Sequence, residues 1–142
     1  MVIVPTGGKD ILDFRSGEII ATENLEACVA VAGISSNLGA LMHLTQVSPV
    51  REFFGWFNEV MPARKTTRIY LVGGMKGTGE EFVNRLRQEL KRGGYVSPRE
   101  EVFTDYIIDL CLKREGAELM YKKQWMAPWG ELQYQPLFPG ML

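Results

Sequence analysis

The chain has 142 residues, of which 46% are hydrophobic and 23% are charged. This is the composition of a soluble globular protein, and the length suits one domain whose core needs neither disulfides nor a metal. The formal net charge of −1 gives no electrostatic reason to expect binding to nucleic acid or to an anionic membrane. No apolar stretch approaches the ~20 residues of a membrane-spanning helix, and residues 1–8 lack the basic region of a signal peptide. We therefore expect a cytoplasmic protein without membrane insertion.

Short apolar runs predict β-strands in the first third of the chain. Segments 10–14 and 17–22 are two such runs, with Arg15-Ser16-Gly17 as the turn between them. Segments 27–32 and 38–44 follow, separated by a turn-like stretch that begins at Gly33. We predict that these last two segments are adjacent strands.

A helix is predicted next, followed by another strand. Ser48 is the expected N-cap and Pro49 the first helical residue. Apolar residues then recur at helical spacing until Pro62 closes the helix. Residues 68–72 form a strand that ends at Gly73-Gly74.

The second half of the chain predicts one more helix and a β-hairpin. Thr78 and Glu81 resemble a capping box, which together with an apolar stripe predicts a helix over 79–92. Alternating apolar residues over 106–113, a glycine-containing turn and the segment 118–121 predict the hairpin.

The order of these elements predicts the fold class and the domain organisation. We expect an α+β fold with a layered, sandwich-like β-sheet core and two main helices. Residues 1–142 are predicted to form a single domain, in which residues 125–142 are a C-terminal extension containing proline and tryptophan.

One histidine and two cysteines carry the reactive chemistry of this sequence. If the strands at 27–32 and 38–44 are paired, the thiol of Cys28 and the imidazole of His43 lie side by side, as in a cysteine nucleophile with its base. The single histidine is assigned to Cys28, so Cys111 has no base and is predicted to be structural. A purely structural role for Cys28 stays open, because a cysteine among small apolar residues is often a buried hydrophobic residue. These residues lack metal-ligand spacing, so we expect no metal and no cofactor.

Two further features have a functional and a structural interpretation. The glycine-rich segment 73–79 precedes a helix, as a phosphate-binding loop does, but it lacks the Gly-Lys-Ser/Thr ending. A tight strand-to-helix turn beside the active site is the favoured interpretation. The aromatic cluster around Trp56 covers more than one helix face, so Trp56 is a candidate contact for a partner protein.

Three short stretches resemble the family of the chemoreceptor glutamine deamidase CheD. Segment 22–31 has a threonine six residues before a cysteine, followed by small and β-branched residues, as that family has. Segment 39–43 matches its Gly-Ala…His stretch, and segment 70–75 matches its strand that runs into two glycines. The order of the predicted elements from about residue 17 to residue 121 also resembles that family.

The resemblance implies a function and a role for each of three residues. Cys28 would be the nucleophile, His43 the general base and Thr22 the residue that orients the imidazole. The same arrangement occurs in bacterial deamidase toxins of the cytotoxic necrotizing factor type. The implied activity is hydrolysis of a glutamine side-chain amide in a protein substrate, a chemoreceptor or another glutamine-bearing protein, with a regulatory protein as a further partner and a role in chemotaxis.

The chain departs from the family at Glu26-Ala27, where the family has Gly-Ser. A carboxylate beside the thiol favours the neutral thiol over the thiolate, which is the wrong direction for a nucleophile. This departure supports an alternative function, a catalytically inactive module that binds or regulates a protein. A redox sensor built on Cys28 is a third hypothesis.

Overall fold

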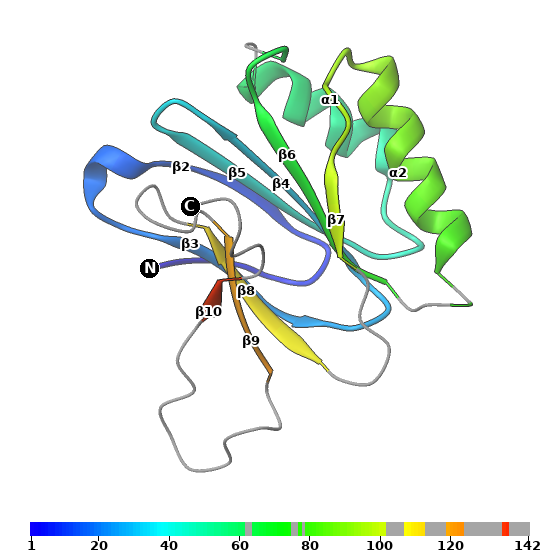
Figure 1. The fold of residues 1–142 in the computed structure, drawn as a ribbon, viewed down its shortest axis with the longest axis horizontal. Coiled ribbons are helices and arrows are strands. Elements are labelled where there is room, and N and C mark those ends of the chain that lie inside the picture. Colours follow the sequence, from blue (N-terminus) through cyan, green and yellow to red (C-terminus); the bar gives the residue numbers. More distant parts are fainter. Residues whose placement is uncertain are drawn as a thin grey trace.

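In the computed structural model, the described part of the chain forms two five-stranded sheets and two helices, arranged in three layers (Figure 1). Both helices cover one face of the first sheet, and the second sheet packs against its other face (Figure 1). The predicted α+β class with a layered core is thus confirmed. The structure describes residues 1–61, 64–74, 77, 79–101, 107–112, 119–123 and 135–136.

The helix-covered sheet has the strand order β2-β5-β4-β6-β7. Its strands are β2 (Lys9–Asp13), β5 (Leu38–Leu44), β4 (Val29–Ser35), β6 (Arg68–Gly73) and β7 (Arg99–Glu101). Only the β6–β7 pair is parallel among these neighbours. The central strands β4, β5 and β6 are apolar on both faces because one face meets the helices and the other meets the second sheet.

The second sheet has the order β1-β3-β8-β9-β10. Its strands are β1 (Val2–Val4), β3 (Ile20–Leu25), β8 (Ile108–Leu112), β9 (Leu119–Lys123) and β10 (Gln135–Pro136). Strands β8 and β9 pair antiparallel, as the hairpin prediction requires, whereas β1 runs parallel to β3. The short 3₁₀ turn Phe14–Ser16 connects β2 to the second sheet.

The predicted strand pair around the reactive residues is present. Strands β4 and β5 are antiparallel neighbours over their whole length, with Ser35 opposite Leu38. The turn is shorter than expected, because Gly33 belongs to β4 and only Ser36 and Asn37 lie between the strands. Ser36 takes a left-handed backbone conformation (φ 52°), which lets so short a connection reverse the chain.

Both helices are confirmed, but the predicted N-cap of the first helix is wrong, and the capping box predicted for the second involves Thr78, which lies outside the described residues. Helix α1 (Val50–Val60) has Pro49 as its N-cap and makes no side-chain capping bond. The hydroxyl of Ser48 accepts a hydrogen bond from the N–H of Thr45 instead, at 2.9 Å, and so serves the preceding turn. Helix α2 (Glu80–Arg92) has Gly79 at its N-cap position, again without a side-chain cap.

Residues 62, 63, 75, 76 and 78, which include Pro62 and Thr78, lie outside the described residues. So does most of the predicted extension 125–142, apart from β10, which pairs with β9.

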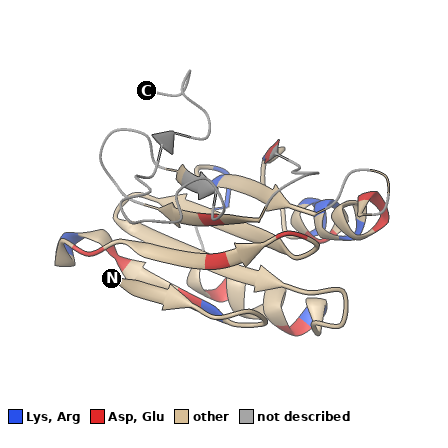
Figure 2. Ribbon diagram, turned by 90° about the horizontal axis from the view of Figure 1, so that it is seen from below, with Lys and Arg blue, Asp and Glu red and all other residues tan. Residues whose placement is uncertain are grey.

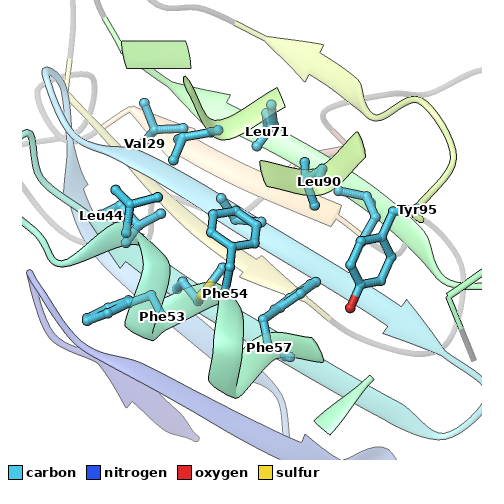
Figure 3. Packing of buried hydrophobic residues seen from close by; sticks show 14 of the residues in the cluster. Val29, Leu44, Phe53, Phe54, Phe57, Leu71, Leu90 and Tyr95 are labelled. Carbon is cyan, nitrogen blue, oxygen red and sulfur yellow. The ribbon is translucent and has the colours of Figure 1, made fainter. Parts of the chain in front are cut away.

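Two hydrophobic clusters lie on the two faces of the helix-covered sheet. Figure 3 shows the first, in which Phe53, Phe54 and Phe57 of α1 pack onto residues of the sheet and of α2. The second lies between the sheets and includes Ile20, Leu25, Ala30, Leu41, Tyr70 and Ile108. Positively and negatively charged residues are interspersed along the helices and strand ends, while most of the strand length is uncharged (Figure 2). Among the described helices, none is long and apolar enough to cross a membrane.

Candidate active site

A hydrogen-bonded pair of polar side chains lies buried between the two sheets. Thr22 of β3 and His43 of β5 both have no solvent exposure, although the residues around them are apolar. The Thr22 hydroxyl and Nδ1 of His43 are 2.7 Å apart. A buried polar pair inside an apolar layer is costly unless it is hydrogen-bonded, so the close distance explains how the core accommodates it.

The surroundings of Thr22 determine where the proton of this bond lies. The Thr22 hydroxyl donates to the carbonyl oxygen of Val4 at 2.7 Å, and a carbonyl can only accept. The hydroxyl has one proton, so toward His43 it must accept, and Nδ1 must carry the hydrogen. In the neutral imidazole Nε2 is therefore the unprotonated nitrogen, the atom that acts as a base.

Nε2 of His43 is buried and has no hydrogen-bond partner among the described residues. Such an atom needs an explanation, because buried nitrogen atoms in proteins are normally satisfied. An unprotonated ring nitrogen is a hydrogen-bond acceptor, so a donor group is needed to satisfy it.

Cys28 lies on the same face of the sheet as His43. Ala30 is directly opposite His43 in the β4–β5 register, and Cys28 comes two residues earlier, at the diagonal position. Residues two apart on a strand point to the same side, and Cys28 packs against the inter-sheet cluster to which Ala30 belongs. Its thiol is free and half-buried, and no hydrogen bond joins it to Nε2 within the described structure.

The two glycines at the end of β6 hold the backbone of Cys28. The N–H of Gly74 donates to the carbonyl oxygen of Cys28 at 2.9 Å. A Cβ on Gly73 would overlap that same carbonyl oxygen, and the φ of Gly73 is 112°, which other residues rarely adopt. The Gly-Gly end of the strand is thus required by the close approach of Cys28.

The electrostatics of the pair favour neutral side chains. Burial, and after it the carboxylate of Glu26, raises the pKa of the Cys28 thiol above its ordinary value. Burial also lowers the pKa of the His43 imidazole. Both shifts oppose a thiolate–imidazolium ion pair, so near neutral pH the resting site holds a thiol and a neutral imidazole.

Cys28 lies one residue before the start of β4 and is half-buried. A hollow of about 270 Å³ lined by Gln46, Glu81, Phe82 and Arg85 lies just beyond the end of β5, and Cys28 is not among its lining residues. A larger hollow of about 590 Å³ lies between the start of α1 and α2. None of the three candidate residues lines either of these hollows. The buried, unpartnered Nε2 of His43, and not the size of a hollow, marks the candidate site.

The N-terminal segment supplies a part of the site that was not predicted from the sequence. Val4 supplies the acceptor for Thr22, the N–H of Gly7 donates to the carbonyl of His43 at 2.9 Å, and the N–H of His43 donates to the carbonyl of Gly8 at 3.0 Å. These are backbone contacts, which leave little trace in sequence. The one signal was the Gly7-Gly8 pair, since Gly7 has a φ of 75°.

The remaining candidate residues lie away from this site. Cys111 is buried on β8, where it is opposite Ala21 and Met120, and it forms no disulfide bond with Cys28. Trp56 is partly buried against the helix-side cluster, and its ring centroid is 5.9 Å from Nζ of Lys9.

No protein-family model matches this chain, and no curated protein has significant sequence similarity to it.

Proposed function

We propose that this protein is a protein-glutamine deamidase of the CheD type, in which Cys28 is the nucleophile, His43 the general base and Thr22 the residue that orients the imidazole. The observation that carries the proposal is the buried, unpartnered Nε2 of a histidine whose other nitrogen is held by Thr22. A base prepared in this way beside a half-buried thiol has the arrangement that nucleophilic catalysis needs.

The first half of the reaction forms a thioester and releases ammonia. As the Cys28 sulfur attacks the carbon of the side-chain amide, its proton passes to Nε2 of His43. The tetrahedral intermediate collapses, the C–N bond breaks, and the imidazolium returns the proton to the leaving nitrogen. Since both groups start neutral, proton transfer accompanies the attack instead of preceding it.

The second half hydrolyses the thioester. Water gives a proton to Nε2 as its oxygen attacks the thioester carbon, and the C–S bond then breaks. The proton returns to sulfur, which restores the thiol, and the product is a glutamate side chain. Thr22 accepts the Nδ1–H throughout and stabilises the transient imidazolium, as an orienting group does.

The N–H of Cys28 is the best candidate to bind the oxyanion of the intermediates. The carbonyl of Cys28 accepts a hydrogen bond from the N–H of Gly74, which fixes the backbone beside the nucleophile. The N–H of a nucleophilic residue is close to the carbon that its side chain attacks, so it can donate to the developing oxyanion, as in other acyl-transfer enzymes.

A glutamine side chain presented by a protein fits the position of Cys28. This residue is half-buried and lies one residue before β4, so its sulfur is partly accessible from the surface. A long side chain projecting from a protein surface can reach the sulfur there. A chemoreceptor is the substrate that the family resemblance suggests, and chemotaxis the process.

Mass spectrometry of glutamine-bearing proteins and peptides tests this function. The purified protein should convert specific glutamines to glutamate, with release of ammonia. Cys28→Ser should abolish the conversion, whereas Cys111→Ser, the matched change at the other cysteine, should leave it intact. Equal conversion by the wild type and Cys28→Ser would refute the proposal.

One observation favours the alternative, an inactive binding or regulatory module. The pKa of Cys28 is raised, and its thiol makes no hydrogen bond to the imidazole in the described structure. Alkylation by iodoacetamide separates the two functions. A thiol assisted by His43 should react faster in the wild type than in His43→Gln, while a structural thiol should react equally slowly in both.

A further inference from the structure

Strand β3 contains an irregularity between the two residues that supply the hydroxyl and the thiol of the site. Thr22 is opposite Leu110 and Leu25 is opposite Ile108, so β3 advances three residues where β8 advances two. One extra residue is therefore inserted in β3, and Asp109 lies opposite the insertion. This is the arrangement of a β-bulge.

The bulge reverses which face of the sheet the following residues occupy. Side chains alternate along a regular strand, so Ile20 and Leu25 would point to opposite faces. Both are completely buried in the cluster between the two sheets, which the extra residue makes possible. Beyond Leu25 the chain crosses to the other sheet, and Cys28 lies on this crossing, one residue before β4.

Asp109 holds the bulge from the neighbouring strand. Asp109 as a whole is only 4% exposed, and its Oδ1 accepts a hydrogen bond from the N–H of Asn24 at 3.1 Å. Asn24 has a φ of 62°, a left-handed conformation that asparagine adopts more readily than most residues but less readily than glycine. The buried carboxylate that accepts from the N–H of Asn24 helps to hold this conformation, because hydrogen bonds to charged groups are stronger than neutral ones.

We propose that Asp109 is a positioning residue for Cys28, because it fixes the Asn24 bulge that sets the path of the chain from Thr22 to the thiol. The crossing is then held at both ends, by Asp109 before it and by Gly74 after it. The proposal rests on Cys28 as the site of the proposed function, but its test uses thiol reactivity and does not need a deamidation substrate.

Replacement of Asp109 tests the proposal through the reactivity of the two cysteines. Asp109→Ala should release the crossing and expose Cys28. Because burial is the main cause that raises the pKa of this thiol, its pKa should fall, and each unit increases the thiolate fraction at neutral pH about tenfold. We expect iodoacetamide to label Cys28 at least about threefold faster, which corresponds to a fall of about half a unit in its pKa. Cys111, identified by peptide mapping, should stay protected.

Three further variants distinguish positioning from a general loss of stability. Asp109→Asn keeps an acceptor oxygen and should label like the wild type. Asn24→Gly, which favours the left-handed conformation, should restore slow labelling in the Asp109→Ala protein. Leu90→Ala removes a buried side chain of α2 far from the bulge, so it should lower the melting temperature without changing the ratio of Cys28 to Cys111 labelling.

The proposal would be overturned if Asp109→Ala lowered stability but left the rate and pH profile of Cys28 labelling unchanged. It would also be overturned if Leu90→Ala changed the labelling ratio as much as Asp109→Ala does. Should Asp109→Ala fail to fold, Asn24→Val provides the second measurement. Valine disfavours a positive φ at this exposed position, so it should accelerate Cys28 labelling in the same way; unchanged labelling there counts against the proposal.

Discussion

Replacement of Thr22 by valine tests the hydrogen-bond chain Val4–Thr22–His43. Valine has the shape of threonine but no hydroxyl, so the buried Nδ1–H of His43 loses its acceptor. A buried donor without a partner costs about 1–3 kcal/mol, and the loss of the bond to the Val4 carbonyl adds about 1 kcal/mol. We therefore expect the free energy of unfolding to fall by about 2–4 kcal/mol, and deamidation to fall by about 10–100-fold.

Urea unfolding and nitrogen NMR measure the two consequences separately. His43 is the single histidine of the chain, so imidazole ¹⁵N spectra contain one pair of resonances. The wild type should show hydrogen on Nδ1, and Thr22→Val should shift the population toward hydrogen on Nε2, because Nδ1–H is no longer stabilised. Thr22→Ser keeps the hydroxyl and is the matched control, with wild-type spectra. Unchanged tautomer and unchanged unfolding free energy in Thr22→Val would refute the proposed chain.

Three further predictions concern charge, packing and pH. Glu26→Gln should lower the pKa of Cys28 and speed its alkylation at neutral pH, more than Glu23→Gln does; equal effects would show that proximity of Glu26 is unimportant. Gly73→Ala should displace the carbonyl of Cys28, with a melting temperature lowered by several degrees and altered Cys28 labelling; wild-type labelling would contradict the packing argument. Burial lowers the pKa of folded His43, so its contribution to stability is complete above the unfolded value of about 6.5 and is lost as pH falls toward the folded pKa. The urea midpoint of unfolding should therefore decline more steeply from about pH 7.5 to 5.5 in the wild type than in His43→Gln. Parallel declines in the two proteins would refute the lowered pKa of His43.

The strands around the site were predictable because their apolar patterns and turns are local. The pairing of β4 with β5 followed from two short apolar segments close in sequence, and it placed His43 on β5 and Cys28 directly before the neighbouring strand β4. Thr22 was singled out by resemblance, and its position beside His43 is an observation of the structure. Its catalytic role, with those of Cys28 and His43, stays a prediction.

The N-cap of α1 was predicted wrongly because a neighbouring turn uses the same hydroxyl. The hydroxyl of Ser48 has two local uses, as a cap or within the Thr45–Ser48 turn, and sequence does not rank them. The bulge at Asn24 was invisible for a related reason. The acceptor of the Asn24 N–H, Asp109, is 85 residues away in the chain, so no local sequence pattern indicates this hydrogen bond.

The carbonyl of Val4 could not be predicted from its residue type. Every residue carries a backbone carbonyl, and only the parallel pairing of β1 with β3 places this one beside Thr22. The direction of the proton in the Thr22–His43 bond, and hence the basic nitrogen, depends on that contact.

Trapping of the covalent intermediate tests the central claim most directly. A reactive glutamine peptide is mixed with the protein, the reaction is stopped with acid within one turnover, and the intact protein is weighed. The account predicts an adduct with the mass of the peptide less ammonia, attached to Cys28, absent in Cys28→Ser and sharply reduced in His43→Gln. Conversion of the peptide without such an adduct, or an adduct on Cys111, would contradict it.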